Sequence, residues 1–262
     1  MTQNSFRLSV EELALAFSQI GNPNLGQELL GAQLAIQDPA EIRARLLSAG
    51  HSLLARGWLG IDSQGHFYLD DALARIARVL AHADFSLRFS RAARGIEFEL
   101  TLHFGERGIF AHQLEQGVVH VITELADPAE ATATGLRFFE LTDAMAFTIP
   151  PVEIANAMLE QLKDMDDAAG IAERLANAGV PTAVAALLAP DLARASYRGS
   201  ILRIEYTAAN APVSERGVLV LRGAERLWLM RPFQRAQATF LTLAPGTTEN
   251  LTSEIYALLK PI

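Results

Sequence analysis

Residues 94–110 read RGIEFELTLHFGERGIF, and residues 96–104 within this stretch alternate strictly between apolar and polar side chains. The apolar set is Ile96, Phe98, Leu100, Leu102 and Phe104, and the polar set is Glu97, Glu99, Thr101 and His103. A period of two is typical of a β-strand with one buried face and one face toward water. Further strands are expected at about 109–114 and 118–125, so this region predicts an antiparallel sheet.

Helix signals occur in the sequence both before and after this predicted sheet. Ser9 and Glu12 form a capping box, which predicts a helix that Gly21-Asn22-Pro23 ends. Asp38 and Asp70 are N-cap residues for two more helices. Between these helices, residues 58–69 are expected to form a short hairpin. Further along, the sequence predicts helices from Asp127, over about 152–166 and 171–178, and from Pro245 to about 259. Strands are expected at 193–198, 200–206, 217–222, 226–231 and 236–243.

The order of these elements recurs, which suggests an internal duplication. Glu106-Arg107-Gly108-Ile109 is matched by Glu215-Arg216-Gly217-Val218, and a proline precedes each closing helix. We therefore predict a single α+β domain over residues 1–262, with pseudo-repeats at approximately 36–145 and 146–262. The two halves would join their sheets about a pseudo-two-fold axis into one central antiparallel sheet, flanked by helical bundles.

The composition excludes several classes of protein. The 262 residues are 50% hydrophobic and 20% charged, which excludes a disordered chain. The absence of cysteine excludes disulfides, thiolate metal sites and cysteine nucleophiles. A net charge of -8 argues against a non-specific nucleic-acid coat. Residues 1–7 lack the pattern of a secretory signal and no apolar run is long enough to span a membrane, so we expect a cytoplasmic protein.

Three histidines are the most chemically suggestive residues. His103, His112 and His120 lie in adjacent predicted strands, with Glu97 and Glu99 on the same predicted face as His103. Neighbouring strands could bring two imidazoles and a carboxylate to metal-binding distance. The simpler interpretation is a set of solvent-facing strand residues, and whether the three cluster in space is left open. His51 and His82 are expected on helix surfaces and His66 in a turn.

Other motifs of catalysis or cofactor binding are missing. The sequence has no Gly-x-Ser-x-Gly elbow, phosphate-binding loop or dinucleotide fingerprint, so we predict a protein without catalytic, cofactor-binding or metal-binding residues. Asp164, Asp166 and Asp167 lack the spacing of a calcium loop and are expected at a solvated helix end. Trp58 and Trp228 could anchor a partner, but we expect both to pack in the core.

A DNA-binding alternative rests on residues 40–69. A helix followed by a hairpin there resembles a winged-helix fragment, with Arg43, Arg45 and Arg56 available for phosphates. The acidic chain and the hairpin, which is not basic, argue against it. Binding to duplex DNA that weakens steeply with salt would support this alternative.

The chain also resembles the EspG family of ESX (type VII) secretion-associated proteins. The resemblance is carried by Leu8–Leu13, by Leu53–Leu59 running into Leu69–Leu73, by Leu80–Leu87, and by the strand order after Gly217. It covers nearly the whole chain and implies a central sheet with two flanking helical bundles. It also implies a non-enzymatic cytosolic chaperone that keeps an aggregation-prone secretion substrate soluble. In the family the clients are PE–PPE heterodimers, and no contact residue can be carried over to this sequence.

Overall fold

A computed structural model describes residues 5–141, 145–207 and 212–260. The strands in this part of the chain are β1 (Ser5–Ser9), β2 (Leu59–Ile61), β3 (Phe67–Leu69), β4 (Phe85–Ala93), β5 (Ile96–Gly105), β6 (Gly108–Glu115), β7 (Val119–Leu125), β8 (Val152–Ala155), β9 (Tyr197–Tyr206), β10 (Pro212–Arg222), β11 (Leu227–Arg235) and β12 (Ala238–Pro245). The helices are α1 (Val10–Gln19), α2 (Pro23–Leu34), α3 (Pro39–Ala55), α4 (Asp71–Ala81), α5 (Pro128–Phe138), α6 (Asn156–Leu162), α7 (Ala168–Asn177), α8 (Thr182–Ala193) and α9 (Thr248–Leu259).

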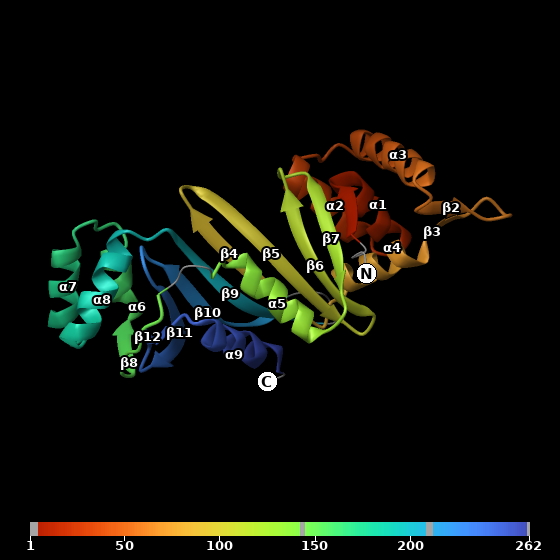
Figure 1. Ribbon diagram of the computed structural model, residues 1–262. Helices are drawn as coiled ribbons and strands as arrows, with labels where there is room; N and C mark the ends of the chain where they lie inside the picture. The colour runs from red at the N-terminus through yellow and green to blue at the C-terminus, as the bar shows by residue number, and fades with distance from the viewer. Residues whose placement is uncertain (1–4, 142–144, 208–211, 261–262) are drawn as a thin grey trace. The chain divides into compact units, whose positions relative to one another are not determined.

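The predicted α+β class with a large antiparallel sheet is confirmed (Figure 1). Ten strands are hydrogen-bonded in the order β1-β7-β6-β5-β4-β9-β10-β11-β12-β8, and β2 pairs with β3 in the expected hairpin. The chain forms two compact units. Unit 1 takes in the described parts of residues 1–86, 100–131 and 205–213, and unit 2 takes in those of 87–99, 132–204 and 214–262. No helix in the described ranges has both the length and the apolar character needed to cross a membrane.

Helices α1 to α4 belong to unit 1, and local capping explains where they begin. The Ser9 hydroxyl accepts from the Glu12 amide at 3.1 Å, and the Glu12 carboxylate accepts from the Ser9 amide at 2.9 Å, so the predicted capping box is confirmed. Asp38 and Asp70 cap α3 and α4 as expected. Helix α2 is an addition to the prediction. The Asn22-Pro23 pair that ends one helix also caps and opens the next.

One face of the unit 1 sheet is covered by these helices. Its core contains Leu8, Leu13, Phe17, Leu53, Leu73, Ile76, Phe110 and Ile122. Phe110 pairs with His103, and Ile122 pairs with His112, so both histidines lie on the covered face. The prediction that the polar face of β5 is exposed to solvent is therefore wrong at the His103 end of the strand. The alternation was right for Leu100 and Leu102, which are buried, but Ile96 and Phe98 are 58% and 41% exposed.

Two corrections concern unit 2. The helix predicted over 152–166 is β8 followed by α6, because Val152 and Ile154 are buried and pair with Leu243 and Leu241 of β12. The strand predicted at 193–198 is wrong, since α8 ends at Ala193 and β9 begins at Tyr197. Helix α8 is apolar on all sides and shows no amphipathic period, which is why the sequence analysis missed it.

The strand order bears on the proposed repeat. β1 and β8 each pair with the last of the next four strands of the large sheet, β7 and β12, and each is followed directly by a helix. However, Glu106-Arg107 lies in the turn between β5 and β6, whereas Glu215-Arg216 lies inside β10. The two Glu-Arg-Gly sequences therefore occupy positions that are not structurally equivalent. The internal repeat stays a prediction, and β1 lies outside the predicted first repeat at 36–145.

Candidate functional site

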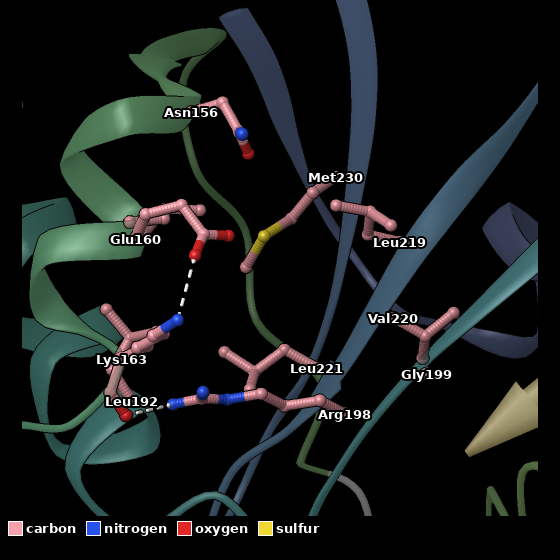
Figure 2. A pocket seen from close by; sticks show the side chains of 11 residues that line it. Asn156, Glu160, Lys163, Leu192, Arg198, Gly199, Leu219, Val220, Leu221 and Met230 are labelled. Carbon is pink, nitrogen blue, oxygen red and sulfur yellow. Dashed lines mark hydrogen bonds and ion pairs between the residues drawn. The ribbon is translucent and has the colours of Figure 1, made fainter. Parts of the chain in front are cut away.

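A groove in unit 2 lies between α6 and strands β9, β10 and β11 (Figure 2). Its cavity volume is about 170 Å³. The walls are apolar and are formed by Leu159, Leu192, Leu219, Leu221 and Met230. The polar residues around it are Asn156, Glu160, Lys163 and Arg198. A concave apolar surface with few polar groups is typical of a binding site.

The local fold places each wall. Helix α6 directs Leu162 into the core of unit 2, where it is fully buried, and leaves Leu159 half-buried beside the groove. On the sheet, Leu219 pairs with Met230 and Leu221 pairs with Trp228, so all four side chains lie on one face. Leu192 comes from the last turn of α8. The floor of the groove is therefore an extension of the unit 2 core toward the surface.

The polar rim is held by two contacts (Figure 2). Lys163 Nζ lies 3.3 Å from Glu160 Oε2, and both side chains are half or more exposed. Arg198 Nη2 donates to the carbonyl oxygen of Lys163 at 2.8 Å. Lys163 is the C-cap of α6, where a cation next to the last carbonyls is favourable. A guanidinium and an ammonium group thus stand at the mouth of an apolar hollow.

A more polar hollow adjoins this groove. It shares Lys163, Leu192 and Arg198 with the groove and is also lined by Arg94, Asp164 and Asp166. Asp167, the last of this acidic run, caps α7 by accepting from the amides of Ala169 and Gly170, each at 3.0 Å. The acidic run therefore joins α6 to α7, and two of its residues line the adjoining hollow.

The chemistry of the groove favours binding over reaction. None of the eleven residues that line it carries a hydroxyl, thiol or imidazole group. Its only ionisable groups are the Glu160–Lys163 pair and Arg198. This arrangement can hold apolar side chains and donate hydrogen bonds to carbonyl or carboxylate oxygens.

Comparison with known proteins identifies the family. The model of a family described as uncharacterised protein YfjC matches residues 5–248. The chain belongs to the YfjC family. No curated protein matches this YfjC-family chain in sequence. Among solved structures, it is similar to the type VII secretion system chaperone EspG5 of Mycobacterium tuberculosis in complex with the PE25–PPE41 dimer, with a TM-score of 0.66, 14% identity, and coverage of 98% of this chain and 96% of that one. The EspG resemblance is therefore confirmed at the level of the fold.

The three strand histidines of the YfjC-family chain come together in unit 1. His112 Nε2 lies 2.8 Å from His120 Nδ1, and the rings of His103 and His112 are 5.7 Å apart. His120 Nε2 also contacts Gln33 Oε1 at 3.1 Å. The solvent-facing interpretation is wrong for His120, which is 1% exposed. Within the described ranges, no group of three or more His, Cys, Asp or Glu side chains could hold a metal ion.

Burial governs the charge of His112 and His120. It lowers the pKa of His120 to about 4. It also lowers the pKa of His112 well below its usual range, and repulsion from charge on His103 and His120 adds to this effect. The expected carboxylate partner is engaged elsewhere, because Glu99 forms an ion pair with Arg88 at 3.2 Å. His51, His66 and His82 are exposed, as expected.

The two tryptophans lie outside the groove lining. Trp228 is fully buried, as predicted, and its indole N–H donates to Asp191 Oδ2 at 2.9 Å. Trp58 is half-buried, with its ring 5.2 Å from that of Phe6 and with the Arg56 guanidinium 3.6 Å from its centre. Both tryptophans are structural residues of their units.

The arginines of the DNA-binding alternative are largely engaged. Arg45 pairs with Glu11 and Glu41, at 2.9 and 3.0 Å. Arg56 pairs with Glu12 at 2.9 Å and covers Trp58. The β2–β3 hairpin is present, but it exposes Ile61, Phe67 and Tyr68, each by more than half, where a DNA-binding wing would carry cations.

The groove residues were not identified from the sequence. The sequence predicts one helix over residues 152–166, which would place Ile154 and Met158 on one stripe. Pro150-Pro151 followed by alternating Val152, Glu153 and Ile154 is a strand signal that could have separated β8 from α6. No signal in the sequence predicts that Leu159 of α6 and Met230 of β11 line the same groove. Their proximity depends on the pairing of strands that are far apart in the sequence.

Proposed function

We propose that this YfjC-family protein is a non-enzymatic, cytoplasmic protein-binding adaptor or chaperone. It keeps a partner protein soluble by holding an apolar segment of that partner in the groove between α6 and strands β9–β11. The observation that carries this proposal is the apolar wall of Leu159, Leu219 and Met230 beneath a cationic rim. Burial of one apolar side chain there contributes about 1.5–3 kcal/mol. Arg198 and Lys163 can donate to carbonyl or carboxylate groups at the ends of the segment.

The fold comparison supports the class of partner. EspG5 is a chaperone with a similar fold, and its structure was solved in complex with the PE25–PPE41 dimer. By analogy we propose a helical secretion substrate as the partner of this chain, within a type VII-like secretion system. We also keep the proposal of a single domain over residues 1–262, with pseudo-repeats at about 36–145 and 146–262.

The test compares capture of partner proteins by matched variants. Leu159→Glu places a charge in the apolar wall, and Lys163→Glu reverses one charge at the rim. Leu47→Glu is the control, because Leu47 is a leucine of another helix, α3, and is 64% exposed. Tagged proteins are used to capture partners from native lysate, and recovered proteins are quantified by mass spectrometry.

We expect Leu159→Glu to recover at least about tenfold less partner than the unmodified protein. Loss of a buried contact at a binding centre costs about 2 kcal/mol. Lys163→Glu should lose less, and Leu47→Glu should behave as the unmodified protein. A thermal melt of each variant confirms that it is folded. Equal recovery by the unmodified protein and by both groove variants would contradict the groove as the binding site. Recovery of duplex DNA alone would favour the winged-helix alternative.

A further inference from the structure

We propose that the buried histidine chain of unit 1 is a proton-sensitive latch that holds α2 on the sheet at neutral pH and releases it in acid. The chain runs from His112 on β6 to His120 on β7 and then to Gln33 near the end of α2. Figure 1 shows α2 and β7, the two elements that this last contact joins. This proposal is independent of the groove in unit 2.

The hydrogen-bond roles in the chain require a neutral His120 ring. Gln33 Oε1 can only accept, so His120 Nε2 carries a hydrogen and donates to it. In a neutral ring the other nitrogen, Nδ1, is then an acceptor, and it accepts from His112 Nε2 at 2.8 Å. A second proton on His120 would place two donors face to face or force His112 into its other tautomer. In either case it would leave a cation in a site that is 1% exposed.

Few residues of α2 are fully buried, although Leu25, Leu29 and Leu34 pack, partly buried, against the neighbouring core clusters. Its buried residues are Gly26 and Leu30. Leu30 packs with Val10 and Ala14 of α1 in a small cluster of buried residues. A Cβ on Gly26 would lie 2.5 Å from the carbonyl oxygen of Ala14, so the two helices touch closely there. Most of the remaining α2 side chains are partly or fully exposed. A helix with only two fully buried residues is expected to open at lower free energy than the core.

The charged groups around the histidines are paired with one another or exposed. Arg75 of α4 pairs with Glu124 of β7, and Arg7 of β1 pairs with Glu115 of β6. Glu12 of α1 pairs with Arg56. The exposed groups are Glu28 of α2, Arg78 of α4, and His82 and Asp84 after α4. On the strands themselves, Ser86 contacts His103 Nδ1 at 3.1 Å. The hydrogen bonds from the sheet to α2 therefore depend on the protonation of His112 and His120.

The sign of the pH effect follows from the direction of the shift. Burial holds the pKa of His120 at about 4, below its ordinary 6.5. A histidine that regains its ordinary pKa in the opened state binds a proton there first as the pH falls. The closed state is therefore fully favoured above pH 6.5 and loses its advantage toward pH 4. For His120 alone, opening at pH 5 should be about 30-fold more favourable than at pH 8.

Amide hydrogen exchange at pH 8 and pH 5, corrected for the intrinsic rate, tests the latch. We expect peptides from residues 23–34 to lose protection by about 30-fold at pH 5. Peptides from α7 of unit 2 serve as the internal reference and should change much less. If both helices change by the same factor, or if α2 does not change, the latch is refuted.

Variants assign the effect to these histidines. His112→Gln with His120→Gln removes the titrating groups and should make α2 exchange nearly independent of pH. The control is His51→Gln with His82→Gln, which replaces two exposed histidines and should retain the response of the unmodified protein. If the buried pair does not fold, Gln33→Leu keeps both histidines and breaks the bond to α2. It should speed α2 exchange about fivefold at pH 8 and weaken the response to acid, and an unchanged response would overturn the proposal.

Discussion

Asp191 of α8 shows how one buried residue can fix the packing of unit 2. Its side chain is 1% exposed and accepts from the Trp228 indole at 2.9 Å. It also contacts the Arg226 guanidinium and the Glu225 amide, each at 3.4 Å. A Cβ on Gly223 would lie 2.2 Å from Asp191, so only glycine fits the turn that approaches it. The carboxylate thus ties α8 to the β10–β11 turn.

Replacement of Asp191 should therefore be costly. We expect Asp191→Ala to lower the free energy of unfolding by about 3 kcal/mol, because it leaves a buried indole N–H and a mostly buried guanidinium without their acceptor. Asp191→Asn keeps an acceptor oxygen and should cost less. Urea denaturation measures both, with the exposed Asp166→Ala as the control. A loss below about 0.5 kcal/mol for Asp191→Ala would contradict this role.

At the scale of elements, the β11–β12 hairpin departs from the usual turn chemistry. Arg235 pairs with Ala238, so the loop consists of Ala236 and Gln237 alone. Both have positive φ, 49° and 73°, which favours glycine or asparagine. The turns at Arg94-Gly95 and Gln116-Gly117 have glycine at their second position and carry less strain. The hairpin is held instead by side chains beside the turn, where the Arg235 guanidinium lies 5.3 Å from the Phe233 ring and 5.2 Å from the Phe240 ring.

Relief of this strain should stabilise the protein. Ala236→Asn with Gln237→Gly installs the preferred residues for a two-residue turn with positive φ at both positions. We expect a gain of about 1–2 kcal/mol in the free energy of unfolding, since a left-handed conformation costs an ordinary residue about that much. Denaturant titration gives the value, and Ala238→Asn, one position beyond the loop, is the control. No gain from the double variant would show that the loop is not strained.

At the scale of the whole molecule, the charge distribution favours a protein partner over nucleic acid. The chain carries a net charge of -8, and Arg45 and Arg56 of the helix-hairpin segment pair with carboxylates of α1. Binding to nucleic acid gains most of its affinity from cations that replace counterions on phosphates. This protein instead presents apolar surfaces, the groove of unit 2 and the exposed tip of the β2–β3 hairpin.

We therefore expect no duplex binding tighter than about 10⁻⁴ M at near-physiological salt, which is the weak end of non-specific binding. Fluorescence anisotropy with a labelled duplex over a range of salt concentrations measures this. Arg43→Ala, on the same helix, should leave the signal unchanged. Micromolar binding that falls steeply with salt and is lost in Arg43→Ala would revive the winged-helix alternative.

Much of the local structure could be read from the sequence. The caps at Ser9, Asp38 and Asp70, the hairpin at 58–69, strands β5 to β7 and the last helix were predicted close to their observed bounds. These features depend on hydrogen bonds and side-chain periods within a few residues, so the sequence contains their causes. The predictions failed at β8 and α8, where a short edge strand and an evenly apolar helix lack a distinctive period.

The tertiary structure alone decided the sites. His120 is buried and His112 is half-buried because helices of unit 1 cover their face of the sheet. The alternation along β6 and β7 fixes the face on which each histidine lies but not what covers that face. The groove exists because β10 and β11 bring Leu219 and Met230 opposite Leu159 of α6, across a separation of about 70 residues. Burial and proximity across such distances follow from which strands pair and which helices pack on them, and no pattern of neighbouring residues encodes that choice.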